Sequence, residues 1–115
     1  MGKKILVVDD DDGIRYLLED LLDWVGYSPI ICKNGEHAIS YIKQADLLIT
    51  DFNMPPGMNG AELTKIAKRE KPSLPVIIMT GNPKDIPANH LADQVIDKPF
   101  KNGELEKVIA DLLPH

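Results

Sequence analysis

The sequence lacks several features that mark whole classes of proteins. Its 115 residues include one cysteine, Cys32, so no disulfide can form within the chain, which fits a reducing compartment. No apolar run approaches the roughly 18 residues that a membrane-spanning helix needs. We therefore expect a cytoplasmic chain without membrane attachment. Cys32 ends an apolar stretch, which predicts a packed thiol rather than a reactive one.

An excess of positive charge is also missing. The chain has 13 Lys and Arg against 18 Asp and Glu, a formal net charge of −5, and its pI is about 5.0. A broad surface for nucleic acid or anionic lipid is therefore not expected. The densest basic group is predicted to be the solvated face of a helix. It comprises Lys65, Lys68, Arg69 and Lys71.

The composition suits a single domain over residues 1–115. With 43% hydrophobic residues, the chain has enough apolar material for one core and no room for a second domain. Five short apolar runs are typical of strands, and those without polar alternation suit strands buried on both faces of a parallel sheet. The runs are 5–8, 29–32, 47–49, 75–79 and 94–96.

Helical periodicity fills most of the chain between these runs. Apolar residues recur at three- and four-residue spacing, which is typical of helices with one buried face. The segments are 14–25, 63–67 and 105–112, with a weaker one at 38–42. Strands and helices that alternate in this way run parallel with right-handed crossovers, which predicts a three-layer α/β sandwich. The segment 81–93 has two prolines and no apolar stripe, so its helix, the fourth, should have one or two turns at most.

Three Asn-Gly pairs precede helical segments, and each is followed by a glutamate. We interpret Asn34, Asn59 and Asn102 as helix N-caps rather than as hairpin turns, because an acid in the first turn of a helix is favourable. Asn59 and Glu62 have the spacing of a capping box.

Four aspartates, Asp9 to Asp12, follow the first apolar run without a break. Carboxylates crowded at the mouth of a buried strand repel one another, and their pKa values rise unless a cation offsets the charge. Oxygen ligands favour a hard ion such as Mg²⁺ over zinc. Asp11 and Asp12 are more simply explained as the cap and first-turn acid of the following helix, which leaves Asp9 and Asp10 for a metal.

Other polar residues stand just past the remaining predicted strands. Ligands of open parallel sheets bind beyond the carboxyl ends of the strands, where Asp51, Thr80 and Lys98 join Asp9 and Asp10. Two carboxylates can hold Mg²⁺ while a third binds the metal and attacks phosphorus, and a hydroxyl and an ammonium can receive phosphoryl oxygens. The set therefore predicts Mg²⁺-dependent formation of an aspartyl-phosphate.

In this order the motifs resemble a receiver domain of response regulators in two-component signalling, of the chemotaxis-regulator-like type, over essentially the whole chain. The resemblance implies a flavodoxin-like, doubly wound (βα)5 fold whose five-stranded parallel sheet has the order 2-1-3-4-5, with a shortened fourth helix. The matching pieces are Ile5-Leu6-Val7-Val8-Asp9-Asp10, Asp51-Phe52-Asn53-Met54-Pro55 with Met58-Asn59-Gly60, Thr80-Gly81, and Lys98-Pro99-Phe100.

The resemblance also implies the roles of the metal-site residues. Asp51 is the implied phosphoacceptor, and Asp9 and Asp10 bind Mg²⁺, one of them through water. The backbone carbonyl of Asn53 completes the protein ligands. Mg²⁺ is the implied cofactor, with Mn²⁺ as a substitute.

The remaining motif residues receive the phosphoryl group. Thr80 donates a hydrogen bond to it, Lys98 pairs with it, and Gly81 leaves its path open. The Lys98–Pro99 peptide is expected to be cis, a form that proline makes accessible.

The implied function is a phosphorylation-switched signalling module rather than an enzyme, because its product is its own modified state. A histidine kinase or a histidine phosphotransfer protein would donate the phosphoryl group. The output partner or output domain is not specified, and a monomer or weak dimer is expected.

Three features depart from the family pattern. The loop after Asp51 is one residue longer than the commonest spacing, at 55–58. Val95, three residues before Lys98, stands where the family usually has an aromatic residue. The segment before Val95 is several residues shorter than usual.

Three other functions stay open. A degenerate receiver would serve as a phosphorylation-independent interaction module, an interpretation with which Val95 and the short segment are compatible. A Mg²⁺-dependent aspartyl phosphohydrolase usually has a second acid two residues after its nucleophile, where this chain has Asn53. A small-ligand binder on this fold usually has a glycine- or hydroxyl-rich first loop rather than a run of aspartates.

Other polar and aromatic residues have simpler explanations. Arg15 is predicted to be a surface cation, and Trp24 to be partly packed beside the apolar stripe of its helix. His37, His90 and His115 lack metal-ligand spacing and are expected at the surface.

Overall fold

The computed structural model describes residues 2–101 and 103–113. It contains a sheet whose strands lie in the order β2-β1-β3-β4-β5, and every neighbouring pair is parallel. This is the doubly wound, flavodoxin-like sheet that the resemblance implied. The strands are β1 (Lys4–Val8), β2 (Ser28–Cys32), β3 (Leu47–Asp51), β4 (Val76–Thr80) and β5 (Gln94–Asp97).

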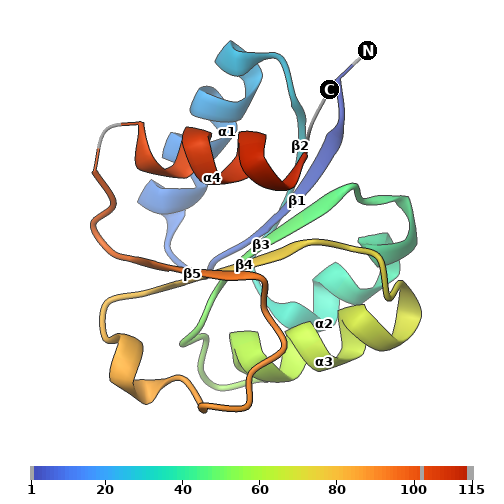
Figure 1. Cartoon of the computed structure of the whole chain (residues 1–115), viewed down its shortest axis with the longest axis vertical. Helices are drawn as coiled ribbons and strands as arrows, with labels where there is room; N and C mark the ends of the chain where they lie inside the picture. The colour runs from blue at the N-terminus through green and yellow to red at the C-terminus, as the bar shows by residue number, and fades with distance from the viewer. Residues whose placement is uncertain (1, 102, 114–115) are drawn as a thin grey trace.

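Helices cover both faces of this sheet, as Figure 1 shows. One face carries α1 (Asp12–Val25) and α4 (Glu104–Leu112). The other carries α2 (Gly35–Ala38), the 3₁₀ helix η1 (Ile39–Gln44) and α3 (Gly60–Glu70). The predicted three-layer architecture is therefore confirmed.

Alternate residues of the central strands enter two separate cores. Ile5 packs with Leu18 of α1 and Ile109 of α4, whereas its neighbour Leu6 packs with Leu63 of α3. All are fully buried. Successive side chains of a strand point to opposite faces, so a strand covered on both sides is apolar at every position. This explains the unbroken apolar runs in the sequence.

Two crossovers have less α-helix than the others. The second contains one turn of α-helix, α2, followed by η1. The fourth contains the single 3₁₀ turn η2 (Pro83–Asp85). The predicted short fourth helix is thus one turn long, and the described residues form four α-helices.

Most of the predicted caps are present. The side chains of Asp11 and Asn34 accept hydrogen bonds from backbone N–H groups of α1 and α2. Asn59 and Glu62 form the predicted capping box of α3. Asn102 lies outside the described residues, and the N-cap of α4 is Gly103, whose positive φ of 80° suits glycine.

One prediction about exposure is wrong, and a second holds only in part. Trp24 is 88% exposed rather than partly packed, because it follows Leu22 by two residues and so lies roughly 160° around the helix from that buried side chain. The basic face of α3 is only partly solvated. Lys68 Nζ donates to the Leu74 carbonyl and to Asp93, and Lys71 Nζ donates to the Lys43 and Ala45 carbonyls.

Within the described ranges, no helix combines the length and the apolar character that a bilayer crossing requires.

Candidate functional site

Three carboxylates meet at the carboxyl end of the sheet. Val8 at the end of β1 lies beside Thr50 of β3, so the next residue of each chain segment, Asp9 and Asp51, falls at the same edge. Asp10 follows directly. Oxygen atoms of Asp9, Asp10 and Asp51 all lie within 4.8 Å of one another. The structure therefore brings together the three acids that the sequence predicted to share a site.

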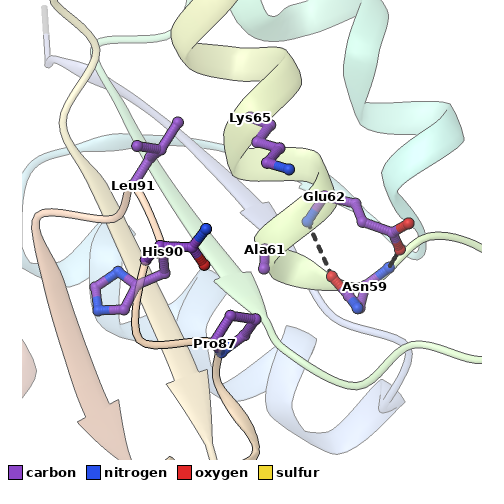
Figure 2. Close-up of a pocket in the computed structure, with 8 residues that line it drawn as sticks. Asn59, Ala61, Glu62, Lys65, Pro87, His90 and Leu91 are labelled. Carbon is purple, nitrogen blue, oxygen red and sulfur yellow. Dashed lines mark hydrogen bonds between the residues drawn. The ribbon is translucent and has the colours of Figure 1, made fainter.

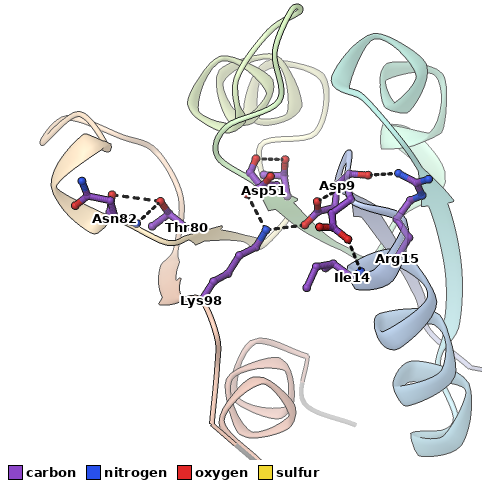
Figure 3. Close-up of polar contacts among 9 residues, drawn as sticks. Asp9, Ile14, Arg15, Asp51, Thr80, Asn82 and Lys98 are labelled. Carbon is purple, nitrogen blue, oxygen red and sulfur yellow. Dashed lines mark hydrogen bonds and ion pairs between the residues drawn. The ribbon is translucent and has the colours of Figure 1, made fainter.

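Lys98 joins this cluster from the far side of β4. Its Nζ lies 2.9 Å from Asp9 Oδ2 and 3.0 Å from Asp51 Oδ1, as Figure 3 shows. Its backbone N–H donates to the Thr80 carbonyl, which holds the lysine at the end of β4. The ammonium thus bridges two acids that come from different strands.

Two of the three carboxylates in the cluster, Asp9 and Asp51, are buried, and one ammonium lies against them. Burial raises the pKa of Asp51, the charge of Asp9 raises it further, and Lys98 only partly offsets these effects. Burial acts to lower the pKa of Lys98, but its contacts with Asp9 and Asp51 outweigh this, so its pKa is raised. Three carboxylates against one ammonium leave a formal excess of two negative charges (3 − 1 = 2). This donor set fits a hard divalent cation such as Mg²⁺.

The two candidate metal-binding acids of the loop between β1 and α1, Asp9 and Asp10, differ in their surroundings. The Asp9 side chain is fully buried, and its Oδ1 accepts the Asp11 N–H at 2.9 Å while its Oδ2 accepts from Lys98. Asp10 is exposed. Asp11 and Asp12 serve the helix as predicted, with Asp11 as the N-cap and Asp12 in the first turn.

Thr80 lies at the same sheet edge, but its hydroxyl is engaged elsewhere. It donates to the Asn82 carbonyl at 3.2 Å and accepts the Asn82 N–H at 3.1 Å, in the local turn drawn in Figure 3. Asn53 is exposed in the loop after β3. The role of its carbonyl as a metal ligand stays a prediction, and so does the contact of Thr80 with a phosphoryl group.

The loop that follows Asp51 is attached at two points. The Glu36 carboxylate accepts the Met58 N–H at 3.1 Å, which ties the lengthened loop to α2. Gly60 packs against the strand end, where an added Cβ would lie 2.4 Å from the Asp51 carbonyl oxygen. The Lys98–Pro99 peptide is cis, as the resemblance implied, and Pro55–Pro56 is cis as well.

Arg15 was predicted to be a surface cation, and the structure corrects this. Its side chain is 19% exposed, its Nη1 donates to the Asp9 carbonyl at 2.7 Å, and its Nη2 pairs with Asp12. Long side chains of a helix lean toward its N-terminus, so an arginine four residues after the cap Asp11 reaches back over the first turn. That offset was the one signal of this contact in the sequence.

A separate pocket of about 190 Å³ lies away from the acids. Figure 2 shows it between the start of α3, with Ala61 and Lys65, and the segment that carries Pro87 and Leu91. This segment belongs to the fourth crossover, which has no α-helix. Val95 of the adjacent β5 is half-buried against the core on the α2 and α3 side of the sheet.

The cysteine and the described histidines do not contribute to the acidic cluster. The Cys32 side chain is buried, as predicted, and burial raises the pKa of its thiol. His37 is exposed and makes an edge contact with Tyr41, and His90 is half-buried and accepts the Ala92 N–H. Neither belongs to a group of potential metal ligands in the described part of the chain. His115 lies outside that part.

This chain covers very different fractions of the relatives that it matches. Sporulation initiation phosphotransferase F from Bacillus subtilis is 34% identical, with 99% of this chain and 96% of that protein covered. The DNA-binding transcriptional regulator NtrC from Proteus hauseri is 37% identical over 96% of this chain but only 24% of that protein. The chain thus spans about a quarter of the length of such regulators.

Solved structures match the whole fold. The response regulator protein TrrA from Thermotoga maritima, crystallised in complex with Mg(2+)-BeF, has a TM-score of 0.86 and 33% identity, covering 96% of this chain and 99% of that one. Chemotaxis protein CheY4 from Vibrio cholerae has a TM-score of 0.87 and 25% identity, covering 98% and 100%.

A model of the response regulator receiver domain matches residues 5–110, which include all the acids of the cluster and Lys98. With the parallel sheet, the acidic edge and these relatives, the match shows that the chain belongs to the family of response regulator receiver domains of two-component signalling.

Proposed function

We propose that this receiver domain accepts a phosphoryl group on Asp51 in a Mg²⁺-dependent reaction with a phosphohistidine. The observation that carries the proposal is the convergence of three carboxylates within 4.8 Å around the Lys98 ammonium. Asp51 is the nucleophile, and Asp9, Asp10 and the Asn53 carbonyl are the remaining protein ligands of the metal.

In the proposed reaction, a carboxylate oxygen of Asp51 forms a bond to phosphorus as the bond from phosphorus to the histidine nitrogen breaks. The nitrogen keeps the electron pair of the broken bond and takes a proton from solvent. Bound Mg²⁺, or Mn²⁺ in its place, would neutralise the acids and the phosphoryl oxygens. Lys98 favours the ionised, nucleophilic form of Asp51 against the effect of burial.

The switch that we propose involves Thr80. Its hydroxyl would exchange the two hydrogen bonds with Asn82 for one to the new phosphoryl group. The turn that contains Asn82 leads into η2 and the short fourth crossover, so a change at Thr80 is transmitted to that surface. Because position 95 is a valine, no aromatic ring reorients together with Thr80.

The relatives support a role in a phosphorelay. Sporulation initiation phosphotransferase F, which this chain covers almost entirely, is named as a phosphotransferase, and TrrA was crystallised with Mg(2+)-BeF. We therefore propose a histidine kinase or a histidine phosphotransfer protein as the donor, and a signalling rather than an enzymatic role. An output partner or an output domain would read the phosphorylated state.

Intact-mass spectrometry of the protein incubated with phosphoramidate, a small donor with a phosphorus–nitrogen bond, tests the proposal. Wild type should gain the mass of one phosphoryl group with Mg²⁺ and none with a chelator. Asp51→Asn should gain none, while Asp20→Asn, which removes an exposed acid of α1, should be labelled like wild type. Undiminished labelling of D51N would refute the assignment of the acceptor, and unlabelled wild type would favour a phosphorylation-independent interaction module.

A further inference from the structure

Arg15 connects α1 to the backbone of the acidic loop. Its Nη1 donates to the Asp9 carbonyl oxygen at 2.7 Å, and its Nη2 pairs with the Asp12 carboxylate in the first turn of the helix. Figure 3 shows the guanidinium beside the Asp9 backbone, on the side away from Lys98. Arg15 therefore contacts the acidic loop through its backbone rather than through its buried carboxylates.

The carbonyl that Arg15 binds belongs to the peptide unit between Asp9 and Asp10. A peptide unit is planar, so a bond to its oxygen restricts the rotation that sets where Asp10 leaves the chain. The Asp9 carboxylate has its own restraints in Asp11 and Lys98. Within the described residues, the Asp10 carboxylate makes no hydrogen bond or ion pair with another side chain.

We infer that Arg15 is a positioning residue for the metal site: its bond to the Asp9 carbonyl presets the direction of Asp10 toward Asp9 and Asp51 before the cation binds. This inference rests on the Mg²⁺ site of the proposed function. Residues that orient metal ligands contribute roughly 10–100-fold to metal affinity.

If Arg15 acted only through its charge, its removal would change the Mg²⁺ affinity in the opposite direction. Arg15 lines the same surface depression as Asp10, together with a second cation, Lys33. A positive charge near a cation site repels the cation, so removal of that charge alone would tighten Mg²⁺ binding. The direction of the change in Mg²⁺ affinity therefore distinguishes a positioning role of Arg15 from an effect of its charge.

Three variants exploit this difference. Arg15→Lys keeps the charge but lacks the planar fork that reaches the Asp9 carbonyl and Asp12 together. Arg15→Gln removes both the charge and the fork. Lys33→Gln is the matched control, because it removes a charge from the same depression and Lys33 is an exposed side chain.

The first measurement is the dissociation constant of Mg²⁺ itself, by titration calorimetry or by amide shifts. R15K and R15Q should both bind Mg²⁺ roughly 10-fold or more weakly than wild type, and K33Q should bind it equally or more tightly. An R15K affinity equal to that of wild type, or a tighter R15Q, would overturn the inference. Wild type that takes up no Mg²⁺ would overturn the proposed function as well.

The second measurement needs no metal. The Asp11 N–H donates to Asp9 Oδ1, so its hydrogen exchange in the metal-free protein reports the order of the loop. Exchange should be faster in R15K and R15Q than in wild type and K33Q, while amides of the central strand β3 exchange at the same rate in all four proteins. Equal Asp11 exchange in wild type and R15K would contradict a positioning role.

Discussion

Lys98 Nζ lies 3.0 Å from Asp51 Oδ1, although β4 separates the strands that lead to these two residues. The ammonium opposes the rise in the Asp51 pKa that burial and Asp9 cause. In the proposed reaction it would pair with the oxygens of the phosphoryl group on Asp51. The ion pair thus places a half-buried ammonium against a buried carboxylate.

Lys98→Gln should slow phosphoryl transfer to Asp51 by about 100-fold or more, the typical loss when one group that stabilises developing charge is removed. Initial labelling rates with phosphoramidate at saturating Mg²⁺ measure this effect. Lys107→Gln, which removes an exposed lysine of α4, should leave the rate unchanged. Equal rates for K98Q and wild type would show that Lys98 has no part in the transfer.

Asp51→Asn should raise the thermal stability of the metal-free protein at neutral pH. The pKa of Asp51 is raised in the folded state, so the folded state binds its proton more tightly than the unfolded state does. The stability that Asp51 contributes in its protonated form is therefore lost as pH rises from the ordinary aspartate value of about 3.9 through the raised pKa. The neutral asparagine avoids this loss.

The gain in thermal stability of D51N over wild type should shrink as the pH approaches the ordinary pKa of aspartate. Mg²⁺ should also reduce it, because the cation stabilises wild type by binding to the folded state. Thermal melts across pH, with a chelator or with Mg²⁺, test both effects. A D51N protein that is less stable than wild type at every pH would contradict the prediction.

Asp93→Asn should lower stability at neutral pH. Burial acts to raise the Asp93 pKa, but hydrogen bonds from Lys68 and from the Val76 N–H outweigh it, so the pKa is lowered. A lowered pKa contributes stability above the ordinary value of about 3.9, and this contribution is lost as pH falls through the folded-state pKa. The difference between D93N and wild type should therefore narrow in acid.

Urea midpoints at neutral pH and in acid measure the effect of Asp93. The control is Asp20→Asn, an exposed acid of α1, whose midpoint should follow that of wild type at both pH values. If the loss of stability in D93N stayed constant into acid, the charge of Asp93 would contribute nothing to stability.

Gly60→Ala should destabilise the fold by about 1–3 kcal/mol, the usual cost of forcing an extra carbon into a packed site. Its Cβ would lie 2.4 Å from the Asp51 carbonyl oxygen, and backbone cannot move aside as a side chain can. Gly81→Ala is the matched control, because its Cβ would have no atom within 4 Å, and it should change stability by no more than about 0.5 kcal/mol. Equal urea midpoints for the two variants would contradict the close approach at Gly60.

Much of the fold was predictable from local patterns. Runs such as 5–8 are apolar at every position because β1 is covered on both faces, and that signal needs no tertiary information. The caps Asp11, Asn34 and Asn59 bond to backbone N–H groups within three residues of themselves. Periodicity did not predict the strand order, which came from the resemblance to receiver domains.

The acids of the site were predictable for a related reason. Parallel strands end at the same edge, so residues that follow each strand meet there whatever lies between them in the sequence. The contacts of Lys68 and Lys71 were not predictable, since their partners lie 25 or more residues away in the chain, except for the Leu74 carbonyl.

By itself, then, the sequence determined the alternation of strands and helices and the residues at each strand end, because these depend on spacing along the chain. Only the tertiary structure decided that Trp24 faces solvent, that Thr80 bonds to Asn82, and that Arg15 binds the Asp9 carbonyl. Such features depend on side-chain direction and on distances of a few ångströms, which residue spacing does not specify.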